Sequence, residues 1–99
     1  MSKYKFDKEM FVKEICKDLR WTVVVELNLD AMSGRIYGIW MTVMTCYMAF
    51  GIETEEQEEI FSAIKDSIGH EFDKTNGRKL AQELMEDYHK GGENWLQQR

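Results

Sequence analysis

Residues 36–52 form a run of seventeen positions without a charged side chain, although 31% of the 99-residue chain is charged. Seventeen residues is the lower limit for a helix that spans a bilayer. Two Gly, two Thr, two Tyr and one Trp dilute this run, and its strongest hydrophobes recur on one side instead of covering its whole surface. We therefore expect the run to lie in the core of a folded domain, with no membrane involvement.

Residues 21–29 show a different pattern, with a period of two. Large apolar side chains alternate there with other residues, and three valines are consecutive. Branching at Cβ restricts valine in helices, so this pattern favours an extended backbone. A continued helix would instead place Trp21, Val24 and Val25 on its polar side. We therefore predict a strand, which needs a partner for its backbone groups.

Two interpretations fit residues 35–50. The first part, residues 35–43, suits the second strand of a hairpin. The same segment fits a helix, because its large apolar side chains recur at spacings of four and three, and Gly51-Ile52 is typical of a helix C-terminus. We predict an α+β, helix-rich fold: an N-terminal helix, a β-hairpin, then two or three helices, the first near residues 44–50. The alternative is an all-α bundle of four helices.

The first helix is predicted at residues 8–20. Asp7 is a suitable N-cap, and Phe6 and Phe11 occupy the two positions of a hydrophobic staple. Apolar side chains repeat every four residues after Phe11, with charged residues on the opposite side. These features together predict an amphipathic helix with one buried face.

The second half of the chain predicts two more helices. Thr54 and Gln57 have the spacing of a capping box at the start of a helix over residues 55–72. A polar break follows, and then a further helical pattern ends at Gly91-Gly92. We predict one compact domain at residues 1–92 and a short C-terminal tail at residues 93–99.

The composition is that of a small intracellular domain. The hydrophobic content of 43% and the length suit one globular domain. The only cysteines are Cys16 and Cys46, which excludes a disulfide-stapled secreted scaffold. The charged N-terminus lacks the apolar run of a signal peptide, so we expect a cytoplasmic protein.

No residue pattern points to catalysis, a metal site or a cofactor. Asp66 and His70 would share a helix face, but a catalytic zinc site generally needs three protein ligands. Cys16 lies on the apolar side of the first helix, where cysteine acts as a small hydrophobe. We therefore predict a protein that is not an enzyme.

Five glutamates within seven residues are the most distinctive local feature: Glu53, Glu55, Glu56, Glu58 and Glu59. Carboxylates in a first helical turn complement the helix dipole, which is the simplest explanation. Two or three would be enough for that, and residues 53–73 carry eight carboxylates against one lysine, a net charge of −7. The other interpretation is an acidic surface that docks on a basic partner. Trp95 either folds back onto the core or anchors the complex.

The functional prediction is a small acidic protein-protein interaction module. It would be an inhibitor, immunity protein, antitoxin or phage-type anti-defence protein that blocks a larger enzyme, one that acts on nucleic acid being a suitable target. The alternative is a homo-oligomer, such as a homodimer, assembled through the Met- and aromatic-rich middle segment. Direct nucleic-acid binding through Lys74, Arg78 and Lys79 ranks well behind, because the net charge is −5.

Overall fold

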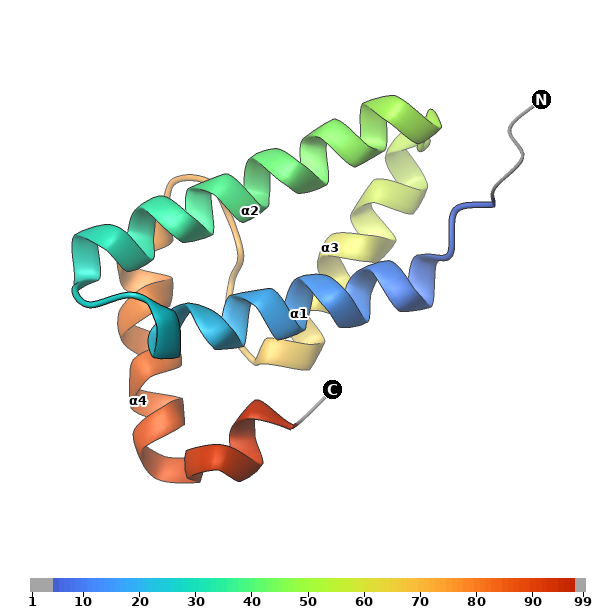
Figure 1. Cartoon of the computed structure of the whole chain (residues 1–99). Helices are drawn as coiled ribbons and strands as arrows, with labels where there is room; N and C mark the ends of the chain where they lie inside the picture. The colour runs from blue at the N-terminus through green and yellow to red at the C-terminus, as the bar shows by residue number, and fades with distance from the viewer. Residues whose placement is uncertain (1–4, 98–99) are drawn as a thin grey trace.

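The computed structural model describes residues 5–97, which form four helices and no strand. The helices are α1 (Lys8–Val25), α2 (Leu29–Phe50), α3 (Thr54–Ile68) and α4 (Gly77–Leu96). In Figure 1, α1 and α2 run antiparallel, α3 passes from the C-terminal end of α2 towards α1, and α4 crosses both near the loop that joins them. None of these helices is long and apolar enough to cross a membrane.

The predicted β-hairpin is wrong, and the all-α bundle of four helices is correct. Residues 21–25 extend α1, and residues 35–43 lie inside α2. The preference of valine against helices amounts to only a few tenths of a kcal/mol per residue, roughly 0.5. The packing of α1 outweighs it, because Thr22 is fully buried and Val23 packs partly buried against the core. The helix does leave Trp21, Val24 and Val25 exposed, and the fold tolerates this.

The predicted start of α1 is confirmed. The Asp7 side chain accepts a hydrogen bond from the Met10 backbone N–H at 3.0 Å. The rings of Phe6 and Phe11 lie 5.2 Å apart, as a hydrophobic staple requires. The helix ends at Val25, five residues later than predicted, and Thr22 in its last turns is fully buried.

Glycines in the left-handed region end both α2 and α3. Gly51 has φ 61°, and the Ile52 N–H donates to the Tyr47 carbonyl at 2.9 Å, which closes the end of α2. Gly69, with φ 78°, ends α3 at Ile68, so this helix is shorter than the predicted 55–72. The chain therefore turns before Phe72, whose side chain is nevertheless buried.

The last turn of α4 follows a break at Gly92, where φ is 57° and ψ is −144°. This is the glycine pair at which the sequence predicts the helix to end. The predicted tail remains helical as far as Leu96, and it carries Trp95 into the core with 6% of its surface exposed. A Cβ on Gly91 would lie 2.7 Å from the Trp95 Cβ, so the two residues are in close contact.

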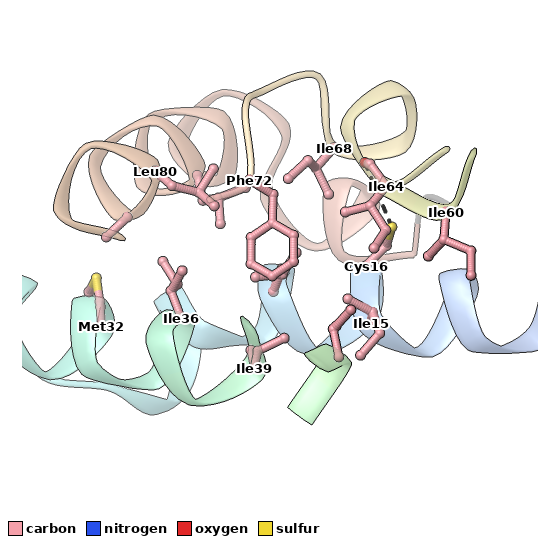
Figure 2. Close-up of a cluster of buried hydrophobic side chains, with 14 of the residues drawn as sticks. Ile15, Cys16, Met32, Ile36, Ile39, Ile60, Ile64, Ile68, Phe72 and Leu80 are labelled. Carbon is pink, nitrogen blue, oxygen red and sulfur yellow. Dashed lines mark hydrogen bonds between the residues drawn. The ribbon is translucent and has the colours of Figure 1, made fainter. Parts of the chain in front are cut away.

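All four helices contribute to one hydrophobic core (Figure 2). The side chains that are completely inaccessible to solvent include Leu19, Ile36, Val43, Ile60, Ile64, Leu80 and Leu84. The start of α4 approaches α2 closely, because a Cβ on Gly77 would lie 2.8 Å from the Ser33 Oγ. This packing fixes where each helix presents its outer side chains.

Candidate protein-interaction surface

The five glutamates lie together at the start of α3, and we call this group the acidic surface. Glu53 is the N-cap residue, and its side chain makes no capping hydrogen bond. Glu55 and Glu56 occupy the first turn. Four of the five side chains are exposed, and that of Glu56 is half-buried. The sequence-predicted residues are therefore one contiguous surface, apart from Trp95.

Two hydrogen bonds hold the start of α3 against the end of α2. The Gln57 side-chain amide donates to the Ile52 carbonyl at 2.8 Å. The Tyr47 hydroxyl donates to the Gln57 carbonyl at 3.3 Å. The predicted capping box is therefore wrong, because Gln57 bonds to the preceding loop and not to a Thr54 cap. These two hydrogen bonds nevertheless hold the start of α3, which carries the acidic surface, in a fixed position against α2.

The negative charge of this surface is only partly balanced. Lys8 on α1 pairs with Glu59, with 2.9 Å between Nζ and Oε2. The hydrogen bond and the charge of Glu59 raise the pKa of Lys8. Within residues 5–97 the other four glutamates form no ion pair. Their charge is therefore open to an external cation.

A groove of about 430 Å³ between α1 and α3 borders the acidic surface. Lys8 and Glu59, which pair with each other, both line this groove. Val12 and Ala63 supply apolar lining farther along the two helices. A partner that docks on the glutamates would therefore meet an apolar depression beside them.

Trp95 does not belong to this surface. The sequence left two alternatives, in which Trp95 folds back onto the core or anchors a complex, and in the structure it folds back onto the core. Its ring lies 5.9 Å from that of Tyr88, and it borders Ser67 and Gly69 at the C-terminal end of α3. The acidic surface is at the opposite end of that helix, about 20 Å away at 1.5 Å per residue. Trp95 therefore stabilises the fold and is not available to contact a partner.

A carboxylate–histidine cluster joins the loop after α3 to α4, and it was not predicted. The ring nitrogens of His70 lie 2.9 Å from Glu83 Oε2 and 2.6 Å from Asp87 Oδ2. Asp66 is not the helical neighbour that the sequence suggests, because α3 ends before His70. Glu83 and Asp87 are four residues apart and therefore share one side of α4. This spacing is the sequence feature from which a paired carboxylate site could have been predicted. Within residues 5–97 no group of three such side chains could hold a metal ion.

Arg20 and Cys16 form a second buried polar group beneath α3. The Arg20 guanidinium donates to the Ser67 carbonyl at 2.6 Å and approaches the Ser67 hydroxyl at 3.3 Å. Burial lowers the pKa of Arg20 and raises the pKa of the Cys16 thiol. A thiol whose ionisation is disfavoured is a poor nucleophile. This group therefore joins α1 to α3 and does not form a reactive centre.

Comparison with known proteins gave no match to a family model, a curated protein or a solved structure. The chain's own surfaces are therefore the basis on which its function is inferred. The acidic surface with its groove is the most distinctive of these.

The buried Tyr47, which supports the acidic surface, should make the folded protein less stable in alkali. Burial raises the pKa of Tyr47 to about 12, from an ordinary value of 10.0. The unfolded chain therefore loses this proton at a lower pH than the folded chain does. The contribution of Tyr47 to the free energy of unfolding is fully present below pH ~10 and declines between pH ~10 and ~12. At pH ~11 the Tyr47 contribution to the loss is about 1.4 kcal/mol. Urea unfolding from pH 8 to pH 11 should show a smaller decline for Tyr47→Phe, whereas the exposed Tyr37→Phe should behave as the unmodified protein.

Proposed function

We propose that this protein is a small interaction module that docks its acidic surface on a basic surface of a larger protein and thereby blocks it. The observation that supports this most is the set of four glutamates at the fixed start of α3 that form no ion pair with any residue in the described range 5–97. The helix dipole accounts for carboxylates at the N-cap and in the first turn, which here are Glu53, Glu55 and Glu56, whereas Glu58 and Glu59 lie beyond that turn. The excess charge is available for a partner.

The chemistry of the partner follows from this charge. Closely spaced carboxylates on a helix attract lysine and arginine clusters, and such clusters are typical of proteins that hold a phosphate backbone. An enzyme that processes nucleic acid is therefore the target class that fits best, and the protein would act as an inhibitor in the cytoplasm. Charge steering would make association fast and dependent on salt. The apolar groove beside the glutamates would accept one side chain of the partner.

The test begins with capture from a nuclease-treated lysate and identification of a stoichiometric partner. Its affinity is then measured against a triple reversal, Glu53→Lys, Glu55→Lys and Glu58→Lys. These three side chains are exposed, and Glu59 is kept because it pairs with Lys8. We expect the affinity to fall at least tenfold, or about 1.4 kcal/mol, with an unchanged circular dichroism spectrum.

A matched control separates the surface from net charge. Glu14, Asp18 and Glu86 are also exposed, and reversing all three to lysine gives the same change in charge elsewhere. This control should bind nearly as tightly as the unmodified protein. If both triple variants lose affinity equally, only net charge matters. If neither does, the docking surface is not at the start of α3.

A further inference from the structure

The groove between α1 and α3 has a basic edge along α1. Lys13 lines the groove, Lys17 follows one turn later, and both side chains are exposed. Within the part of the chain that the structure describes, neither lysine forms an ion pair. Lys8 and Glu9 also line this side, and Lys8 is paired with Glu59. The basic edge therefore carries three lysines against one glutamate.

The α3 side of the same groove is an acidic edge. Glu55, Glu59 and Asp66 are exposed and are spaced four and seven residues apart, so they follow one side of the helix. Glu59 lines the groove, and Glu55 lies one turn before it. Between the two edges, the half-buried Val12 and Ala63 form an apolar floor. The groove therefore presents an apolar strip between two edges of opposite charge.

Contacts between α1 and α3 mark the two ends of the groove. The Lys8–Glu59 ion pair lies at one end. At the other end, the Arg20 guanidinium donates to the Ser67 carbonyl at 2.6 Å. Along α3, residues 59 and 67 are about 12 Å apart, which is about two turns of a helix. A short segment of a partner is therefore enough to fill the groove.

The walls of the groove favour a helical segment over an extended one. Both walls are helices, whose backbone N–H and C=O groups bond within the helix. An extended peptide would find no backbone partner there and would leave its own polar groups unpaired over the apolar floor. A helix satisfies its own backbone and presents only side chains. The small side chains of Ala63 and Ser67 on α3 let such a helix approach closely.

We propose that the groove binds an amphipathic helix of the partner protein, with an apolar side chain between Val12 and Ala63, a basic edge over α3 and an acidic edge over α1. This proposal rests on the proposed function, because the basic edge of that helix is what contacts the acidic surface. A helix with two basic edges would bring like charges onto Lys13 and Lys17, which disfavours binding. The lysines of α1 therefore select among basic partners.

Three synthetic helical peptides test the groove without the natural partner. Each has about 18 residues and the same leucine stripe, because shorter isolated helices are marginal in water. The first carries lysine on one edge and glutamate on the other, the second lysine on both edges, and the third glutamate on both. In fluorescence anisotropy at about 0.15 M salt, the first should bind at least tenfold more tightly than either of the others. Equal affinity of the first and second peptides, or no binding of the first at about 1 mM protein, overturns the proposal.

Variants of the protein test each wall separately, with circular dichroism to check that each one folds. Lys13→Glu combined with Lys17→Glu makes the α1 edge acidic, so the peptide with two lysine edges should then bind more tightly than the first peptide. Ala63→Leu fills the floor and should weaken binding of the first peptide at least tenfold. Ala31→Leu is the matched control, because Ala31 is also half-buried but lies on α2, outside the groove lining. An unchanged order of affinities in the lysine variant, or unchanged affinity in Ala63→Leu, contradicts the proposed site.

This proposal and the proposed function fail separately, because Ala63→Leu leaves all five glutamates of the acidic surface unchanged. If the captured partner binds Ala63→Leu as tightly as the unmodified protein but loses affinity for the triple glutamate reversal, the acidic surface acts alone and the groove proposal is wrong. If the first peptide binds but no basic partner is captured from the lysate, the groove is a helix-binding site and the blocking function is wrong.

Discussion

Replacing Trp95 with alanine is expected to lower the free energy of unfolding by about 3–5 kcal/mol, the range for large aromatic side chains removed from a core. Only 6% of Trp95 is exposed, and its ring packs 5.9 Å from that of Tyr88. Its Cβ also occupies the space left by the absent side chain of Gly91. Urea denaturation followed by circular dichroism measures the effect without relying on the fluorophore that is removed.

Trp21 provides the matched control for this substitution. It is the same residue type on α1, but 37% of it is exposed. Trp21→Ala should therefore cost clearly less than Trp95→Ala. Equal losses for the two variants would mean that the last turn of α4 contributes no more to the core than a surface position does.

Replacing Arg20 with methionine is expected to cost about 2–3 kcal/mol. Arg20 is 1% exposed, and methionine can fill much of its volume, so the loss comes chiefly from polar groups. The Ser67 carbonyl would lose a charged donor at 2.6 Å, and a buried acceptor left without a partner costs about 1–3 kcal/mol. Asp87 would also lose a nearby positive charge. Thermal or urea unfolding at neutral pH measures the change.

Ser67→Ala distinguishes the carbonyl from the hydroxyl in this contact. It removes the approach at 3.3 Å and leaves the shorter bond to the backbone intact. We expect a loss of less than about 1 kcal/mol. If Ser67→Ala is as damaging as Arg20→Met, the hydroxyl and not the backbone carbonyl is the important acceptor.

The sequence predicts those features of the fold that depend on neighbouring residues. Asp7 caps α1 and Gly51 ends α2 through contacts within five residues, and both are readable from residue type. The state of residues 21–25 depends on packing against distant elements. Thr22 is buried there, and the core contacts of α1 outweigh the preference of Val23, Val24 and Val25 for strands.

The candidate surfaces also divide into features that neighbouring residues specify and features that depend on distant ones. The glutamates are contiguous in sequence, so any helix that begins near Glu53 brings them together. The partners of Arg20 and His70 lie 47 and 13–17 residues away, and no local pattern specifies such pairs. The sequence left residues 35–43 open between strand and helix, and only the structure places them inside α2.

The position of α1 has a consequence for how the chain folds. It packs against α2, α3 and α4, whereas short connections at residues 26–28 and 51–53 join the first three helices. Synthesis produces α1 first, yet its buried face can be covered completely only after α4 has emerged. Of the four helices, α1 therefore has its buried face uncovered for the longest time during translation.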